Sequence, residues 1–286
     1  MICVYHKKDN DGFCSAAIIQ RKYPDAEFIG YDHGDDHIKF LDFIDEEIIV
    51  VDISFPMNIM YNIASRNKLT WIDHHASSID SYNVFDHSTD NNINAILEVG
   101  RAACELTWEY IFPNEFMPIG IECLGKYDTW RGYGSDEWNH YILPFEYGMR
   151  SICSSFETFP KFVIDYNEGE AIDSIINSGR IIIGYQNVVD SKLCVSNSFV
   201  RRFKGYRALC LNVPYIDSNT MQSVFNASEH DLMLSFTFKG THWSCSLRSQ
   251  GDLDVSAIAK SMGGGGHKNA SGMELTTAQL VELFKL

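Results

Sequence analysis

The stretch KLTWIDHH, residues 68–75, is a short apolar segment that ends in an acid and two adjacent histidines. A run of this length, with two β-branched residues and a tryptophan, is typical of a buried β-strand. Its polar end therefore lies where a strand leaves a sheet. Because neighbouring residues of a strand point to opposite faces, we expect His74 and His75 to have different roles.

Segments of the same kind precede this strand at regular intervals. Strand-like runs cover residues 2–6, 26–32 and 47–54, and helix-like segments cover 12–23, 35–44 and 56–67. Such alternation predicts an α/β fold with a parallel sheet and helices on both faces. A longer helical region is expected at about 94–127.

The pattern changes in the last third of the chain. A long helix predicted at 168–192 is followed by strand-like YRALCLNV, DLMLSFTFKG and HWSCSLRS, and then by the helical segments DVSAIAKSM and TTAQLVELFK. We therefore predict a catalytic domain at 1–165, a helical connector at 166–193 and a smaller α/β domain at 194–286.

Composition indicates a globular protein without a membrane partner. No apolar run in the 286 residues reaches the roughly 18–20 residues that cross a bilayer. The first residues, MICVYHKKDNDG, place charges after the apolar run, unlike a signal peptide. Eight scattered cysteines without a CxxC pair are expected to be buried, reduced thiols. These features predict a cytoplasmic location.

Charge is distributed unevenly along the chain. Residues 1–193 contain 14 Lys and Arg against 31 Asp and Glu, and residues 194–286 contain 9 against 7. The first part is too acidic to hold a long duplex electrostatically without help, although bound metal ions could invert the sign locally. We expect a metal-binding catalytic part and a part that grips the substrate. A solvated charge imbalance without a function is the alternative.

Side chains of types that can bind metal ions follow the predicted strands. They are His6, Asp9, Asp11, Asp52, Asp73, His74 and His75, with Asp128 after a later helix. Each alone has an ordinary explanation, such as helix capping. Together they fall at one edge of one sheet, where open parallel sheets bind ligands. Imidazole and carboxylate groups without thiolates suit Mn²⁺, or alternatively Mg²⁺, Fe²⁺ or Zn²⁺. The carboxylates are too many for one ion, and two ions about 3.5–4 Å apart would suit phosphoester hydrolysis.

A glycine run marks the second predicted domain. Ordering the four glycines of GGGGHKNASG, residues 263–272, costs backbone entropy and needs a cause. Close approach of backbone amides to a phosphate near a helix N-terminus is one cause, and a flexible linker is the alternative. The charged residues that come next favour phosphate. The predicted substrate-binding residues are Arg248, Gly264, Gly265, Gly266, His267 and Lys268.

Five motifs in order resemble the DHH phosphoesterase superfamily. HKKDNDG (6–12), VVDIS (50–54), DHH (73–75) and GKYDTW (125–130) resemble its four motifs, and GGGGHKNASG resembles its DHHA1-type C-terminal domain. The resemblance covers nearly the whole chain and is strongest to the small oligoribonuclease (nanoRNase) and nucleotide phosphodiesterase group.

The resemblance implies a dinuclear manganese site and a set of roles. His6, Asp9 and Asp52 would bind one ion, and Asp11, Asp52, His74 and Asp128 the other, with Asp52 bridging. His75 would contact the phosphate or assist proton transfer, and Asp73 would orient a histidine. The DHHA1-type domain would hold the far end of a short substrate, across a cleft from the metals.

The function that we expect is a manganese-dependent phosphodiesterase that hydrolyses short single-stranded oligonucleotides or nucleotides to nucleoside monophosphates. Alternatives within the enzyme class are hydrolysis of cyclic mononucleotides or dinucleotides, of 3′-phosphoadenosine-5′-phosphate or of polyphosphate. A nucleotide-binding regulatory module with an inactive site is the alternative outside that class. The sequence leaves open whether the protein is a monomer or a homodimer.

Overall fold

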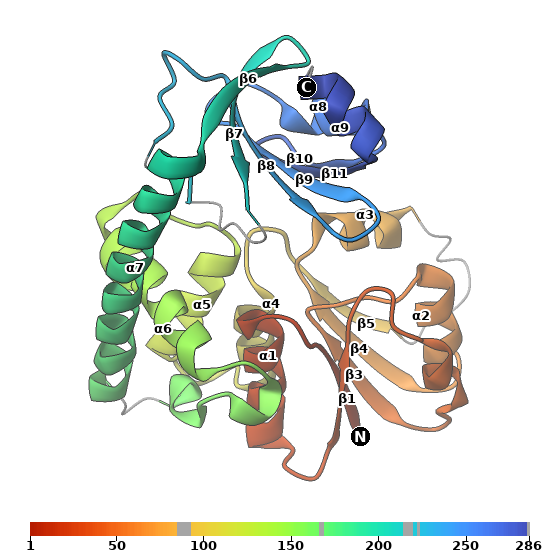
Figure 1. Cartoon of the computed structure of the whole chain (residues 1–286). Coiled ribbons are helices and arrows are strands. Elements are labelled where there is room, and N and C mark those ends of the chain that lie inside the picture. Colours follow the sequence, from red (N-terminus) through yellow and green to blue (C-terminus); the bar gives the residue numbers. More distant parts are fainter. Residues whose placement is uncertain (85–92, 166–168, 214–219, 222–223, 285–286) are drawn as a thin grey trace. The chain divides into compact units, whose positions relative to one another are not determined.

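The chain forms two compact units, residues 1–183 and 184–286 (Figure 1). The structure is a computed structural model that describes residues 1–84, 93–165, 169–213, 220–221 and 224–284. Each unit has its own sheet and its own core. The mixed α/β fold class is therefore confirmed, and the domain boundaries given above stay a prediction.

The N-terminal unit is built on a parallel sheet. Its described strands are β1 (Ile2–His6), β2 (Glu27–Tyr31), β3 (Glu47–Val51), β4 (Lys68–Asp73) and β5 (Ile93–Leu97). They lie in the order β2-β1-β3-β4-β5, and every pair is parallel. Since all the strands run the same way, their carboxyl ends lie along one edge.

Helices cover both faces of this sheet, as the alternating pattern predicts. They are α1 (Asn10–Lys22), α2 (Met57–Ala64), α3 (Ala76–Asn83), α4 (Ala103–Ile111), α5 (Ile119–Asp128) and α6 (Leu143–Ile152). In β1, Cys3 and Tyr5 join the core that includes α1 and α4, whereas Ile2 and Val4 join the core that includes α2. The period of two along a buried strand therefore divides the apolar side chains between two cores.

The prediction of a helical region from about residue 94 is wrong at its start. Ile93–Leu97 is the edge strand β5, which pairs in parallel with β4 (Leu69 opposite Ile93). A short apolar run fits a strand and a buried helix turn equally well by periodicity, so pairing with β4 decides the outcome.

The connecting helix α7 (Gly169–Asn197) continues beyond its predicted end. Its two internal glycines do not interrupt it. A Cβ at Gly179 would lie 1.7 Å from the carbonyl oxygen of Pro144, so only glycine allows α7 to pack this closely on α6. Gly184 faces open space.

The C-terminal unit has a mixed sheet that is covered on both faces. Its described elements are β6 (Phe199–Phe203), β7 (Tyr206–Asn212), β8 (Leu232–Phe238), β9 (Trp243–Arg248), α8 (Val255–Lys260), β10 (Gly265–His267), β11 (Ala270–Leu275) and α9 (Thr277–Phe284). Helices α8 and α9 pack on one face of the sheet and the end of α7 on the other. The strand order is β10-β11-β9-β8-β7-β6, and β7 and β8 form the parallel pair. Asp254 caps α8 by accepting the amides of Ser256 and Ala257, as the acid at that position predicts.

The glycine run lies in a different element from the one expected. It leads from the predicted helix α8 into the hairpin β10–β11, and not into a helix N-terminus of the kind at which phosphates often bind. A Cβ at Gly264 would lie 2.1 Å from the carbonyl oxygen of Gly272, and Gly266 has φ +135°. Close approach of two strands therefore accounts for two of the glycines.

Two compositional predictions can be compared with the structure. All eight cysteines are buried and free, as predicted. Within the described part of the chain, no helix combines the length and the apolar character needed to cross a bilayer.

Candidate metal centre

The acids and histidines that follow the strands meet at the carboxyl edge of the parallel sheet. His6 ends β1, Asp52 follows β3, and His74 follows β4. Asp9 and Asp11 lie where α1 begins, and Asp128 ends α5. The structure therefore brings together all six predicted metal ligands.

One group forms around the ring of His6. Its Nδ1 lies 2.8 Å from Oδ2 of Asp9 and 3.3 Å from Oδ2 of Asp52. Asp9 also caps α1 by accepting the amide of Gly12 at 3.0 Å, so its capping role and its place at the site coexist. A Cβ at Gly12 would lie 2.1 Å from the carbonyl oxygen of His6, which is why the helix begins this close to the strand only with glycine.

A second group forms around the ring of His74. Its Nε2 lies 3.5 Å from Oδ2 of Asp11, 3.4 Å from Oδ1 of Asp52 and 3.1 Å from Oδ2 of Asp128. Asp52 thus turns one oxygen to the first group and the other oxygen to the second. This is the arrangement that a bridging carboxylate needs.

The carboxylate of Asp52 is buried without hydrogen-bond donors. Its side chain is 1% exposed, and neither oxygen receives a hydrogen bond from the described residues. Burial, reinforced by the charge of Asp9, raises its pKa to about 8. Its backbone has φ +59°, a conformation that a side-chain-bearing residue rarely adopts and that often marks a functional position. Divalent cations would satisfy both oxygens and favour the ionised form, so the residues present fit a metal pair.

Other predicted ligands also have raised pKa values. Burial raises the pKa of Asp11 well above its usual range, and the charges of Asp52 and Asp128 add to the effect. Burial also raises the pKa of Asp128. For His6, burial lowers the pKa, but the neighbouring carboxylates of Asp52 and Asp9 outweigh it and raise the value to about 11. Several shifted pKa values in one cluster make these residues a candidate functional site.

The two histidines lie side by side, contrary to the expectation of opposite faces. β4 ends at Asp73, so strand alternation no longer applies, and the rings of His74 and His75 are 4.5 Å apart. They differ in what they contact. Nε2 of His74 faces the acids, whereas Nδ1 of His75 lies 2.7 Å from Oδ1 of Asp73.

Asp73 supports both histidines. The same oxygen accepts the backbone amides of His74 at 2.7 Å and His75 at 3.1 Å. Its contact with the ring of His75 is the largest cause of the raised pKa of that imidazole, which is about 9. Nε2 is then the ring nitrogen of His75 that can face a substrate.

Two contacts that hold predicted ligands in place were not predicted from the sequence. Oδ1 of Asp32 lies 3.5 Å from Nε2 of His6, on the opposite side of the ring from Asp9. An acid at this place fixes the ring orientation of a ligand histidine. The second contact comes from α4, whose first amides, those of Ala103 and Cys104, donate to Asp11 at 2.9 and 2.7 Å. The sequence offers one signal for Asp32, which directly follows the strand β2 that neighbours β1.

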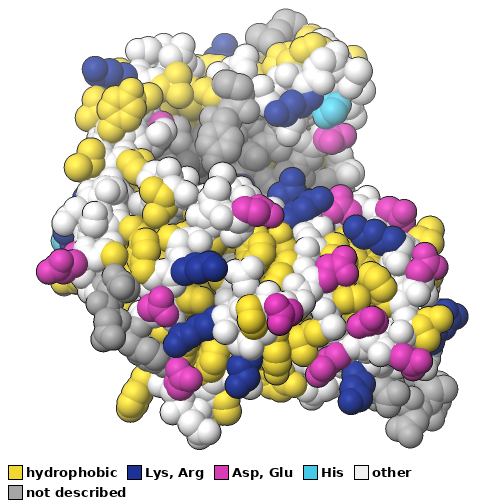
Figure 2. All heavy atoms as spheres, turned by 90° about the horizontal axis from the view of Figure 1, so that it is seen from below, with side chains coloured by type: hydrophobic (Ala, Val, Ile, Leu, Met, Phe, Trp, Pro, Cys, Tyr) yellow, Lys and Arg dark blue, Asp and Glu magenta, His cyan; other side chains and the backbone are white. Residues whose placement is uncertain are grey.

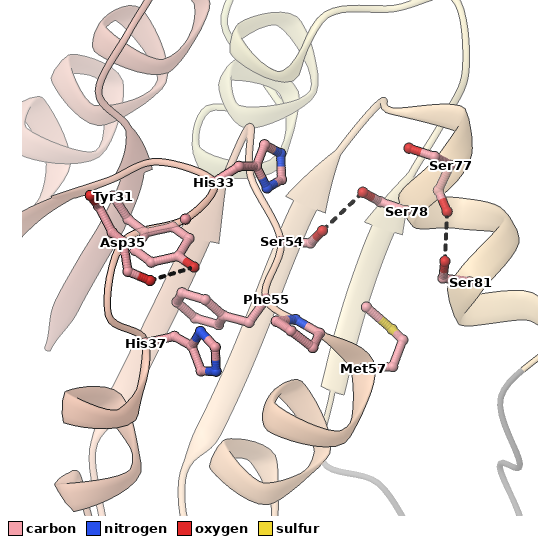
Figure 3. Close-up of a pocket in the computed structure, with 12 residues that line it drawn as sticks. Tyr31, His33, Asp35, His37, Ser54, Phe55, Met57, Ser77, Ser78 and Ser81 are labelled. Atoms are coloured by element: carbon pink, nitrogen blue, oxygen red, sulfur yellow. Dashed lines mark hydrogen bonds between the residues drawn. The ribbon is translucent and has the colours of Figure 1, made fainter. Parts of the chain in front are cut away.

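A pocket of about 420 Å³ opens at the same edge of the sheet (Figure 3). His33 and His37 line one side and the hydroxyl groups of Ser54 and Ser78 another, the latter two 2.9 Å apart. The segment 31–37 is thus a polar loop that rims this edge and holds no metal group of its own among the described residues. Asp36 accepts the amide of Ile38 within the loop, whereas Asp32 contacts His6 and Asp35 lies 2.6 Å from Nζ of Lys7.

The predicted substrate-binding residues cluster in the C-terminal unit. Arg248 ends β9 directly opposite Ala270 of β11, beside the hairpin that carries the glycines. Lys268 is exposed, and its Nζ lies 3.3 Å from Oδ1 of Asp252. The side chain of His267 is outside the described part of the chain. Phosphate binding by Gly264, Gly265, Gly266, His267, Lys268 and Arg248 therefore stays a prediction.

Comparison with known proteins gives one family match and one related sequence. Residues 219–286 match the DHHA1 domain. "Uncharacterized protein R106" of Acanthamoeba polyphaga mimivirus is 27% identical over 95% of this chain and 66% of its own length. This chain thus spans just under two thirds of that relative.

Solved structures resemble the fold. PggH from Vibrio cholerae, described as a pGpG-specific phosphodiesterase, matches 99% of this chain and 96% of its own with a TM-score of 0.58 and 14% identity. The DHH domain of a protein described as a member of a ribosomal protein family matches 99% of this chain and 85% of its own with a TM-score of 0.57 and 13% identity. At these identities the likeness shows the fold alone.

Proposed function

Because the chain is a member of the DHH/DHHA1 superfamily of metal-dependent phosphoesterases, we propose that it is a two-metal phosphodiesterase. Its substrates would be short single-stranded oligonucleotides, which it would hydrolyse to nucleoside monophosphates. Its metal ions would be Mn²⁺. The observation that carries the proposal is the Asp52 carboxylate, buried between two groups of ligands and without hydrogen-bond donors.

The ligand groups fit two ions. His6, Asp9 and Asp52 would hold one, and Asp11, Asp52, His74 and Asp128 the other. Two divalent ions, when bound, supply a nucleophile at neutral pH and offset the charge that develops on phosphoryl oxygens. Imidazole and carboxylate donors without thiolates suit Mn²⁺, as the resemblance also implies.

The residues of the chain then have separate tasks. Asp73 holds Nδ1 of His75, so Nε2 of His75 is directed to the substrate phosphate or to a proton that moves during the reaction. Asp32 orients the ring of His6, and the first amides of α4 orient Asp11. In the C-terminal unit, the backbone of the glycine run and Lys268 would bind a terminal phosphate.

Charge favours small substrates. The net charge of the chain is −15, and in the face drawn in Figure 2 acidic and basic side chains are interspersed, with no continuous basic stripe among the coloured residues. Long polyanions need such a stripe, because their affinity comes from neutralising many phosphates. Short oligonucleotides need few contacts once the metals are in place. A cytoplasmic location agrees with this substrate class and stays a prediction.

The proposal is tested with a substrate panel in Mn²⁺: RNA and DNA of two to twenty-four nucleotides, cyclic dinucleotides, 3′-phosphoadenosine-5′-phosphate and polyphosphate. We expect the highest kcat/KM for dinucleotides to tetranucleotides. Asp52→Asn should abolish turnover, whereas Asp80→Asn, an exposed acid on α3, should leave it unchanged. If the metal-loaded protein hydrolyses none of these compounds, the proposal that it is an enzyme is wrong. If it prefers polyphosphate, the proposed substrate class is wrong.

A further inference from the structure

An aromatic stack begins next to the metal ligand Asp128. It consists of Tyr127, Trp130, Tyr133 and Trp138. Trp138 is 2% exposed, and the rings of Tyr127 and Trp130 are nearly parallel to it, at centroid distances of 5.5 and 5.7 Å. The innermost ring of the stack, that of Trp138, is therefore buried in the N-terminal unit.

The outer members of the stack are open to solvent. Trp130 is 49% exposed and Tyr133 is 52% exposed, with their rings 5.0 Å apart. Of the five tryptophans, Trp71, Trp108 and Trp138 are buried and Trp243 is only partly exposed. Leaving half an indole in water forfeits apolar burial, so the exposure of Trp130 calls for an explanation.

The backbone of Trp130 is held in an uncommon conformation. Its φ is +56°, in the left-handed region that a bulky residue rarely adopts. Hydrogen bonds fix the flanking residues: Thr129 Oγ1 donates to the carbonyl of Gly125 at 2.7 Å, and Arg131 Nε donates to Thr129 Oγ1 at 2.9 Å. Strain that its surroundings enforce is typical of ligand-binding positions. The indole is therefore preorganised.

Trp130 is close to the metal ligands along the chain. Oδ2 of Asp128 lies 3.1 Å from Nε2 of His74. Trp130 follows Asp128 by two residues, so the Cα atoms of Asp128 and Trp130 are at most about 7 Å apart. A phosphodiester bound at the metals carries its nucleoside within a comparable reach. An exposed indole with a tyrosine beside it is the surface on which nucleobases stack, whatever their sequence.

We propose that the exposed face of Trp130, with Tyr133 beside it, stacks on the nucleobase attached to the scissile phosphate and so selects nucleotides over phosphate compounds without a base. This inference rests on the proposed function and adds the substrate class. Polyphosphate and other base-free phosphates have no π face to offer, so the stack would give them no affinity.

The test compares a dinucleotide with the same compound lacking the base at the scissile position. For the wild type, loss of the base should raise KM about 5- to 150-fold, as expected for a stacked base, with little change in kcat. Trp130→Asn removes the ring while keeping a residue that tolerates the left-handed backbone. In this variant the two compounds should have KM values within about 2-fold, and Trp130→Phe should restore part of the difference.

The control and the contrary outcomes separate binding from folding. Tyr110→Leu removes an exposed aromatic ring elsewhere in the unit and should leave the 5- to 150-fold ratio intact. An equal effect of Trp130→Asn on both compounds, or no effect on either, would overturn the stacking role while the phosphodiesterase stands.

A protein that hydrolyses neither compound would contradict the proposed function instead. Stacking is then read from indole fluorescence during titration with adenosine monophosphate. Quenching in the wild type that is lost in Trp130→Phe would support the inference, and equal quenching in both proteins, or none in either, would overturn it.

Discussion

Oδ1 of Asp73, the last residue of β4, lies 2.7 Å from Nδ1 of His75, two positions further along the chain. We predict that Asp73→Asn lowers kcat about 10- to 100-fold, because the imidazole loses the acid that orients it. The metal-induced rise in melting temperature should persist, since Asp73 is outside the ligand groups. A double variant with His75→Ala should be no slower than His75→Ala alone, and additive losses would show that Asp73 acts elsewhere.

Replacing Asp52 should stabilise the metal-free protein and remove the stabilisation that metal provides. In chelator, Asp52→Asn should raise the free energy of unfolding by about 1–3 kcal/mol, because the wild-type carboxyl is buried with its pKa raised to about 8. With Mn²⁺ at a hundred times Kd, the wild type should gain about 2.7 kcal/mol and the variant almost nothing. Denaturant unfolding in both buffers measures this, and a variant that still gains stability from Mn²⁺ would exclude Asp52 as a bridging ligand.

The two glycines inside α7 form a matched pair. Gly184→Ala should stabilise the protein by up to about 1 kcal/mol, because a Cβ there meets open space and alanine favours helices. Gly179→Ala should destabilise it by about 1–3 kcal/mol or more, since the Cβ would clash with the carbonyl oxygen of Pro144. Urea unfolding of both variants checks the signs, and equal effects would refute the close packing of α7 on α6.

Acid sensitivity in the C-terminal unit should depend on Asp231. Its carboxylate accepts the amide of Arg207 at 2.7 Å and lies 2.7 Å from Nη2 of the same residue. Hydrogen bonds from Arg207 lower the pKa of Asp231 to about 2. A group with a lowered pKa stabilises the fold above its unfolded value of about 4, and that contribution fades as pH falls to about 2.

Asp231→Asn should therefore be less stable than the wild type at pH 7, and the difference should disappear near pH 2. Unfolding followed by circular dichroism across this range measures it. Asp252→Asn, at a fully exposed acid, provides the control. A difference that persists unchanged at pH 2 would contradict a role for the carboxylate charge.

The parallel sheet and the meeting of acids and histidines at its edge could be predicted because local patterns encode them. Each strand of the sheet from β1 to β4 is a short apolar run, and parallel strands place the residues after them along one edge. The positions of His6, Asp52 and His74 are consequences of that rule. The family resemblance rests on the same residues, and the DHHA1 match confirms it in the C-terminal unit.

The features that could not be predicted depend on contacts between distant residues. β5 is a strand only because β4 offers it a free edge, and its apolar run alone is equally compatible with a helix. The hairpin after α8 requires glycines because its two strands approach each other closely. The sequence does not distinguish this reason for the glycines from phosphate binding. The sequence allows Tyr127 or Trp130 to stack on a base, with buried aromatic rings as the default alternative. The exposure of Trp130 and its stacking on Trp138 are seen only in the structure.

The hydrogen bonds from α4 to Asp11 have a consequence for how the protein is made. The ligand is fixed by amides 92 and 93 positions further along the chain, and the last ligand, Asp128, comes later still. A nascent chain therefore exposes its first predicted ligands on the ribosome long before the set is complete at Asp128, and the unit itself continues to residue 183. Stalled chains of increasing length should retain Mn²⁺ only after Asp128 has left the exit tunnel.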